Sequence, residues 1–548
     1  MNTMIIHRFF SIRTASLWII LLSGLLSLYW GSAHAQEPNQ LIQTLAKDLS
    51  GKNKQAKLDA IDAIAAAKTP RKMVWLQSML NGDLYLLKSD DSVVIANKDG
   101  KKYALVSAVD GSDAGLVGNR ELRKVKINNA LRKLLKAKLG LLALEDPDTG
   151  KRLEAVRRLT GDIIPETLER IRSLQVEESQ PEVKQALALI IAVSDLPNGT
   201  TEQQKAALTF SEGRLESDLI NALRDTADNN ADPEIRLRAS KILAIADNKR
   251  KWLGRVENLF FGISLGSVLV VAAIGLAITF GVMGVINMAH GELIMLGAYT
   301  TWFIQQLIPS GIAYSLLLAI PAAFVVSGTV GVIIERTVIR HLYGRPLETL
   351  LATFGISLLL QQFVRTVVSP QNVAVINPVW MSGSWAVNPA LSFSLNRLVI
   401  IAFCLVVFVL LLLIFTRTGY GLQMRAVAQN RQMARAMGIR SARVDALTFG
   451  LGSGIAGIAG VALSQLGNVG PNLGQSYIID SFMVVVFGGV GNLWGTLVAG
   501  MSLGIANKFL EPWAGAVLAK IIILVGIILF IQNRPRGLFP QRGRAAED

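Results

Sequence analysis

The chain has 548 residues, of which 51% are hydrophobic, with a mean hydropathy of +0.41 and a formal net charge of +15. So apolar a composition excludes an ordinary soluble enzyme, and the length exceeds that of one domain. The positive charge does not indicate a nucleic-acid partner, because no nucleic-acid-binding motif accompanies it and the arginines of the second half lie in short loops between apolar runs.

Residues 1–35 have the pattern of a secretory signal peptide. A basic start is followed by an apolar core of about 14 residues, LWIILLSGLLSLYW, and then by Ala33-His34-Ala35. An uncleaved first membrane helix is the alternative, but the core falls short of the roughly 20 residues that a span needs. In both interpretations the segment that follows is exported.

Residues 36–250 read as an exported, periplasmic domain. Four stretches share an amphipathic helical pattern that is typical of HEAT or armadillo repeats, and they begin at Asn53, Gly150, Pro181 and Pro233. Between the first two, apolar runs broken by Ser-Asp-Asp and Asp-Gly turns predict a small β-hairpin. No catalytic or phosphate-binding motif is found here, so we expect a docking domain or a purely structural cap.

Residues 258–540 form the predicted membrane domain, and residues 541–548 a cytoplasmic tail. We therefore predict an all-α polytopic membrane protein with about 8–10 transmembrane helices, preceded by a mainly helical exported domain. Nine apolar spans can be placed, at 259–279, 282–306, 312–335, 349–367, 397–415, 445–466, 477–489, 491–509 and 514–531.

The distribution of arginine predicts how these spans are oriented. Loops 336–348 and 416–444 are rich in arginine, whereas loop 369–396 has no basic residue. Because cytoplasmic loops carry an excess of basic residues, the first two should be cytoplasmic and the third external. Residue 257 would then be external and the C-terminus cytoplasmic, so the number of crossings must be odd. Nine spans meet this condition if VVVFGGVGNLWGTLVAG breaks at its glycines into two crossings or a re-entrant pair. We expect a bacterial inner-membrane protein embedded in the lipid bilayer.

Four ordered motifs resemble those of the permease subunits of branched-chain amino-acid ABC importers: INMAHGELIMLGAY, TRTGYGLQMRAVAQNRQMARAMGI, SFMVVVFGGVGNLWGTLVAG and RPRGLF. The long exported extension and the external WMSGSW loop (380–385) resemble the urea-transport permeases within that family. The resemblance implies the fold of an ABC-importer permease and a path for urea or a closely related small amide. A branched-chain amino acid is the alternative solute, and a passive channel or a membrane-anchored scaffold would be a different class of function.

The resemblance also implies the partners of the chain. These are a second, homologous permease subunit, two cytoplasmic ATPase subunits and a periplasmic solute-binding protein. The chain contains no G-x-x-x-x-G-K-S/T loop, so the ATP must be hydrolysed by other subunits. We therefore expect no enzymatic activity, no bound cofactor and no metal site in this chain.

The loop 416–444 resembles the segment that couples such a permease to its ATPase. Its small residues would leave a surface without protruding side chains for docking, and its arginines would anchor it to an acidic cleft of the ATPase. The alternative is a basic loop that only sets the topology. The residues expected to contact the ATPase are Gly419, Arg425, Ala426, Arg431, Ala434, Arg435 and Gly438.

Asn287, His290 and Glu292 lie in a region otherwise almost free of charge. An ionisable residue inside a membrane is costly, so it usually faces a cavity or is paired. A helix, or a break at Gly291, could bring the three side chains together. They would then either line the path and hydrogen-bond a small polar solute, or stabilise a broken segment through contacts of Glu292 with His290, the backbone or a neighbouring helix. Further candidates for the path are Gln361, Gln362 and Asn492.

Overall fold

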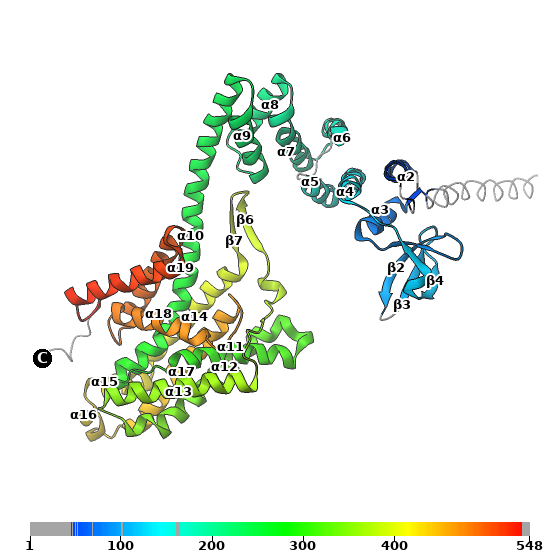
Figure 1. The fold of residues 1–548 in the computed structure, drawn as a ribbon. Coiled ribbons are helices and arrows are strands. Elements are labelled where there is room, and N and C mark those ends of the chain that lie inside the picture. The colour runs from blue at the N-terminus through cyan, green and yellow to red at the C-terminus, as the bar shows by residue number, and fades with distance from the viewer. Residues whose placement is uncertain are drawn as a thin grey trace, which may run out of the picture. The chain divides into compact units, whose positions relative to one another are not determined.

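The computed structural model describes residues 45, 48, 49, 51, 53–67, 69–99, 102–159 and 165–539. The predicted signal peptide and the tail 541–548 lie outside these residues. The chain divides into two compact units, Met1–Ala246 and Asp247–Asp548, while the domain limits inferred from the sequence stay predictions. Helix α10 (Pro233–Met283), the long green helix of Figure 1, begins in the first unit and ends in the second.

The described residues of the first unit form α-helices and one sheet. Helices are present at all four stretches where the sequence predicts them, and Pro181 opens α7 because its missing N–H would have no partner in the first turn. Leu187 and Ile190 of α7 pack with Val156 of α5 and Ile171 of α6 in one apolar core. The helices are α2 (Lys54–Ala66), α3 (Lys72–Asn81), α4 (Asn129–Leu144), α5 (Thr149–Leu159), α6 (Pro165–Glu177), α7 (Pro181–Asn198), α8 (Thr201–Ser211) and α9 (Ser217–Asn229).

The predicted hairpin is in fact a five-stranded antiparallel sheet. Its strands are β1 (Leu84–Leu87), β2 (Val93–Asp99), β3 (Lys102–Ser107), β4 (Asp113–Val117) and β5 (Leu122–Lys124). The order β4-β3-β2-β1-β5 is a meander whose last strand returns to the free edge of β1. The sequence LRK of β5 is too short and too polar to show the alternation by which strands are recognised, so the sequence did not predict it.

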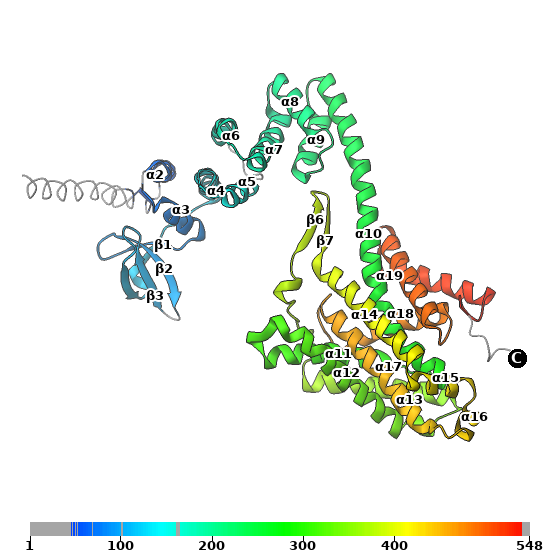
Figure 2. The same cartoon turned by 180° about the vertical axis from the view of Figure 1, so that it is seen from behind.

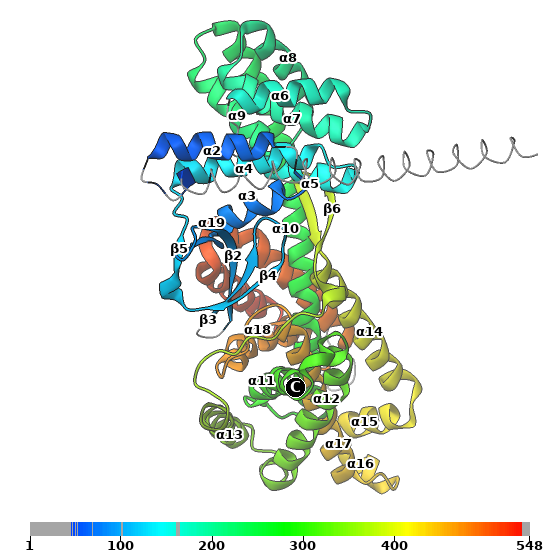
Figure 3. The same cartoon turned by 90° about the vertical axis from the view of Figure 1, so that its right-hand side faces the viewer.

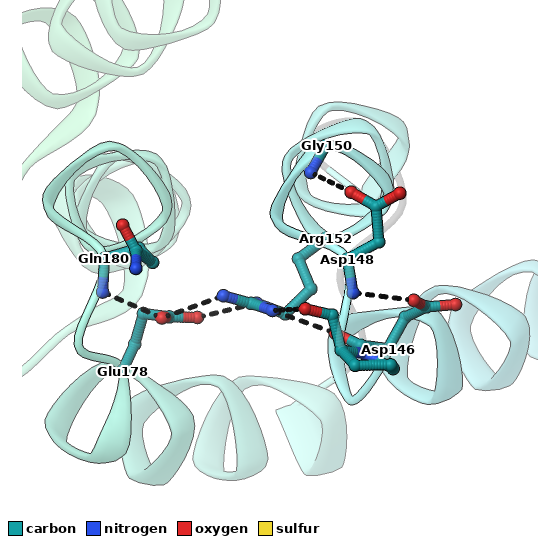
Figure 4. A network of polar contacts seen from close by, with 7 residues as sticks. Asp146, Asp148, Gly150, Arg152, Glu178 and Gln180 are labelled. Atoms are coloured by element: carbon teal, nitrogen blue, oxygen red, sulfur yellow. Dashed lines mark hydrogen bonds and ion pairs between the residues drawn. The ribbon is translucent and has the colours of Figure 1, made fainter.

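A polar network joins the turn between α4 and α5 to the turn between α6 and α7 (Figure 4). Arg152 pairs with Glu178 through two contacts, Nε–Oε2 at 3.0 Å and Nη2–Oε1 at 3.2 Å. It also donates to the backbone carbonyls of Asp146 and Pro147. The backbone amide of Gln180, together with Arg152, holds the pKa of the Glu178 carboxyl below its usual value. Arg152 therefore ties the two turns together through Glu178 and the two carbonyls.

In the described part of the second unit, nine further α-helices and a short hairpin follow α10. The helices are α11 (His290–Leu307), α12 (Ile312–Thr337), α13 (Pro346–Val367), α14 (Leu395–Arg417), α15 (Gly419–Gln429), α16 (Arg431–Ala436), α17 (Ser441–Ser464), α18 (Leu473–Gly488) and α19 (Leu493–Asn533), and the hairpin strands are β6 (Ser384–Asn388) and β7 (Leu391–Ser394). The predicted break in the glycine-rich segment is confirmed, because α18 ends at Gly488 and α19 begins at Leu493.

The chain is a multi-pass membrane protein, although its helices do not match the nine predicted spans one to one. Among the described residues, six helices are long and apolar enough to cross a membrane: α10, α12, α13, α14, α17 and α19. Helix α11 is not apolar enough and α18 has only 16 residues. The last two predicted spans are the two arms of α19, which bends where Pro512 lies within it and Gly515 has a φ of +78°.

Helices α11, α12 and α17 form the centre of the second unit and lie side by side (Figure 2). The backbones of α11 and α17 approach so closely that a Cβ atom on Gly297 would collide with the backbone of Gly457. Helix α13 lies instead at the edge of the unit (Figure 3). Its outer face exposes large apolar side chains, among them Leu351, Leu359 and Phe363.

Candidate functional site

The candidate site is built around a break between α10 and α11. Gly284 ends α10 with a φ of +68°, the left-handed conformation that glycine adopts easily at a helix end. Residues 284–289 are not helical, and the Asn287 side chain closes a local turn by accepting the amide two residues on, at 3.0 Å. Helix α11 begins at His290, so the break precedes Gly291 and does not occur at it.

His290 and Gly291 both serve the packing of α11. His290 is fully buried, and its Nε2 donates to the backbone carbonyl of Ala272 in α10 at 2.8 Å. Gly291 lies against α18, where a Cβ atom would be 2.6 Å from the carbonyl oxygen of Gly474. A glycine is therefore needed at this position because two backbones meet there.

The Glu292 side chain is buried and faces α13. Its Oε1 accepts hydrogen bonds from Gln361 Nε2 at 2.7 Å and from Ser357 Oγ at 3.1 Å. Among the described residues, its Oε2 has no hydrogen-bond partner, and neither has Nδ2 of the buried Asn287. His290 and Glu292 bond to different helices, so the structure joins Glu292 with Gln361 but does not form a mutually bonded group of Asn287, His290 and Glu292.

A polar stripe runs along the buried face of α13. Thr349, Thr353, Ser357 and Gln361 follow one another every fourth residue, which places them on one side of the helix, and all four are buried. Thr353 Oγ1 accepts the Met288 amide at 3.1 Å, so the stripe also contacts the broken segment. The sequence analysis identified Gln361 but missed Thr353 and Ser357, although their four-residue spacing is visible in the sequence.

The two remaining polar candidates lie away from Glu292. Gln362 is exposed and donates to Thr366 Oγ1 at 3.3 Å within α13. Asn492 caps α19 by accepting two backbone amides of its first turn, at 3.0 and 3.1 Å. Asn492 lines a separate cavity of about 260 Å³ together with Arg425 of α15. The structure thus places Asn492 beside the predicted coupling loop.

That loop folds into the short helices α15 and α16, and two of its arginines are engaged within the chain. Arg431 forms an ion pair with Asp445, which is 1% exposed, and its guanidinium carbon lies 4.6 Å from the ring centroid of Tyr343. Arg435 Nε donates to Ser441 Oγ at 2.7 Å. These contacts fix α16 against α17 and leave less of both arginines free for a partner than the sequence suggested.

The expectation that Ala434 offers surface to a partner is corrected. Its side chain is 4% exposed and lies in the apolar core, because α16 turns this face inward. Gly438 is exposed and ends α16 with a φ of +85°. The large exposed apolar side chains of this segment are instead Met433 (61% exposed) and Met437 (78% exposed), which the sequence analysis missed. Of the other predicted contact residues, Gly419 and Arg425 are exposed and Ala426 is half-buried.

Comparison with known proteins identifies relatives of the second unit. Residues 258–531 match the family model described as the branched-chain amino acid transport system permease component. The chain is 32% identical over 293 residues to the high-affinity branched-chain amino acid transport system permease protein LivH of Escherichia coli K12, a match that covers 52% of this chain and 94% of the relative. LivH of Salmonella typhimurium is 31% identical over the same lengths.

A third relative is the high-affinity branched-chain amino acid transport system permease protein BraD of Pseudomonas aeruginosa, at 30% identity over 296 residues, 52% of this chain and 95% of the relative. No solved structure matches the chain at a significant level. The family match begins at residue 258, so the described helices α2–α9 and the five-stranded sheet lie outside it.

Proposed function

This chain belongs to the family of permease components of branched-chain amino acid transport systems, and we propose that it forms part of the membrane path of an ATP-driven importer for urea or a closely related small amide. Members of this family are permease components and not enzymes, and the ATP is hydrolysed by partner subunits. The proposed partners are a second permease, two ATPases and an external solute-binding protein.

The buried carboxylate of Glu292 is the observation that carries the proposal for the solute. One of its oxygens is held by α13, and the other has no partner among the described residues. The unpartnered Nδ2 belongs to Asn287, whose neighbour Met288 donates its backbone amide to Thr353 Oγ1. Thr353 lies one helical turn from Ser357 on α13. A buried acceptor and a buried donor without partners are costly. A neutral amide would suit these two groups, because it offers N–H groups to a carboxylate and a carbonyl to an amide.

A branched-chain amino acid is the second candidate, and the names of the relatives favour it. Its ammonium group could meet Glu292, but its carboxylate would require a cation. Arg365, one turn beyond Gln361, is a cation whose partner, Asn472 Oδ1 at 2.7 Å, is neutral, so it could take this carboxylate. Urea or a related small amide remains the first proposal because it needs only Glu292 and Asn287, and uptake measurements decide between the two solutes.

The test uses the chain together with its partner subunits in membranes, and it measures uptake of labelled urea and of labelled leucine. In Glu292→Gln the oxygen that Gln361 and Ser357 use is kept, but the charged acceptor is lost. We expect normal membrane abundance and a loss of urea uptake of roughly 10- to 100-fold, the range for a hydrogen bond to a charged group. Glu348→Gln, which changes an exposed carboxylate paired with Arg345, is the matched control.

Retained uptake in Glu292→Gln, with reduced membrane abundance only in Glu292→Leu, would assign Glu292 to stabilising the broken segment. If the wild type takes up leucine but not urea, and the Glu292 variants lose leucine uptake, the amino-acid alternative replaces the urea proposal. The third result, normal abundance and normal uptake in both variants, would exclude Glu292 from both roles.

For the ATPase contact, we propose that the docking surface includes Met433 and Met437 of α16 together with Arg425 of α15. Apolar side chains exposed at an end of a membrane protein indicate a protein interface. We expect Met437→Glu to reduce co-purification of the ATPase about tenfold or more without lowering membrane abundance, since a charge at the centre of an interface is poorly tolerated. Met437→Leu should bind normally, and equal ATPase recovery from both variants would contradict the assignment.

A further inference from the structure

An apolar groove of about 520 Å³ lies between α12 and α17 on the outside of the second unit. Val325 and Leu447 line it and are 61% and 56% exposed. Its lining also includes Gly328 and Gly450, one on each helix, where the absence of side chains lets the two helices approach closely. Neither the proposed solute path nor the proposed ATPase contact uses these residues.

Basic residues stand at one end of the groove. Arg336 follows the lining residue Val332 by one turn of α12, and Arg443 precedes Leu447 by one turn of α17. Both arginines are exposed, and Arg336 Nε is 3.6 Å from Glu335 Oε2.

A third arginine, Arg417, ends α14 three residues before Tyr420, which also lines the groove. Among the described residues, Arg417 and Arg443 have no ion-pair partner. The groove therefore combines an apolar body with a cationic end. This end is formed by residues of the two arginine-rich loops, which the sequence predicts to be cytoplasmic.

We propose that this groove binds one anionic phospholipid of the cytoplasmic leaflet, with an acyl chain in the groove and the phosphate held by Arg336 and Arg443. Basic pockets between membrane helices on the cytoplasmic side suit such headgroups. The groove is open to the outside of the helices, and its apolar lining extends over about two turns of α12, from Val325 to Val332, which suits an acyl chain.

The experiment uses the full-length purified chain, stripped of lipid by detergent exchange. It is titrated with palmitoyl-oleoyl phosphatidylglycerol or with phosphatidylcholine of the same chains, and bound lipid is counted by native mass spectrometry. We expect one phosphatidylglycerol to be retained in preference to phosphatidylcholine. Thr329→Trp or Leu447→Trp, which fill the groove, should each lower its retention about tenfold, the loss expected when a well-packed apolar contact is removed. Val326→Trp changes an exposed residue of α12 that does not line the groove, and it should have no effect.

Arg336→Gln and Arg443→Gln should each reduce the preference for phosphatidylglycerol roughly fivefold, the value expected for one basic residue at an anionic membrane surface. Arg345→Gln, which removes an arginine already paired with Glu348, is the control. The proposal fails if the groove-filling variants retain lipid as the wild type does, or if the two lipids bind equally. It also fails if a photo-crosslinker at Thr329 in the assembled transporter captures a protein chain instead of lipid.

Discussion

Helices α17 and α13 both contact α11, but they do so by opposite means. Helix α17 meets α11 backbone to backbone, and Gly297 faces Gly457 with no space for a methyl group. Helix α13 meets α11 through side-chain hydrogen bonds, which Gln361 and Ser357 donate to Glu292. The first contact depends on shape and the second on polar chemistry.

The difference indicates which part of the bundle is suited to handling a polar solute. In a contact between two helix backbones the polar groups are already hydrogen-bonded within their own helices, and the contact cannot be loosened without leaving a cavity. A seam of hydrogen bonds can exchange one partner for another at a small net cost, because a solute can replace the bonds that it breaks. On this comparison, α11 and α17 form the rigid part, and α13 carries the groups that a solute would meet.

The largest effect is expected from a test of the predicted orientation of these helices. Helix α13 should leave the membrane on the external side and α17 should enter it from the cytoplasm, because the preceding loops are rich in arginine. A reporter fused at Asn388 should be active only outside, and one fused at Gln429 only inside. The signal should be all or none. Activity of both fusions on the same side would overturn the assignment of the loops and with it the comparison of α13 and α17.

The shape-dependent contact is tested by Gly297→Ala. The added methyl group collides with the backbone of Gly457, which should cost about 1–3 kcal/mol or more. We expect the amount of folded protein in the membrane to fall severalfold, as measured by size-exclusion chromatography of a fluorescent fusion.

Gly355→Ala is the matched control on α13. An added Cβ atom there meets no other atom within 4 Å, and alanine is the better helix former. Abundance should stay the same or rise. If the two alanine variants accumulate equally, then α11 and α17 are not packed as closely as the structure indicates.

The polar contact is tested by Gln361→Leu and Gln362→Leu, two adjacent positions with the same side chain. Loss of Gln361 removes the 2.7 Å hydrogen bond to Glu292, at a cost of about 1–3 kcal/mol. We expect uptake to fall roughly tenfold while membrane abundance changes less than in Gly297→Ala. Gln362 is exposed, and its hydrogen bonds to described residues lie within α13, so Gln362→Leu should change uptake less than about twofold. Equal losses in the two variants would show that the buried stripe has no special role.

Several features of the fold could be predicted because they depend on local patterns. The apolar runs of α12, α13, α14 and α17 lie where the sequence places spans, and the glycine-rich segment breaks between Gly488 and Leu493. Strand β5 and the kink in α19 could not be predicted. A three-residue strand is stabilised by its neighbour, and a helix with Pro512 and Gly515 can either end or bend, depending on what packs against it.

The candidate site shows the same division. The presence of Glu292 in an apolar region is evident from the sequence, and it marks the residue as one that needs a polar partner. The sequence does not reveal which residue is that partner, because Gln361 and its neighbour Gln362 cannot be told apart until the position of the helix is known. The same limit applies to the coupling loop, where the small side chain of Ala434 suggested an open surface although the residue is buried.

By itself the sequence determined that the second half of the chain is a helical membrane protein and that it belongs to a permease family, because hydropathy and motifs are properties of contiguous residues. Only the tertiary structure decided that Gly291 and Gly297 are needed for close contacts between backbones, that Arg431 pairs with Asp445, and that Glu292 faces Ser357 and not His290. These contacts join residues that are far apart in the chain, and they depend on which faces of the helices meet. A helical pattern defines faces but does not say which neighbour each face will contact.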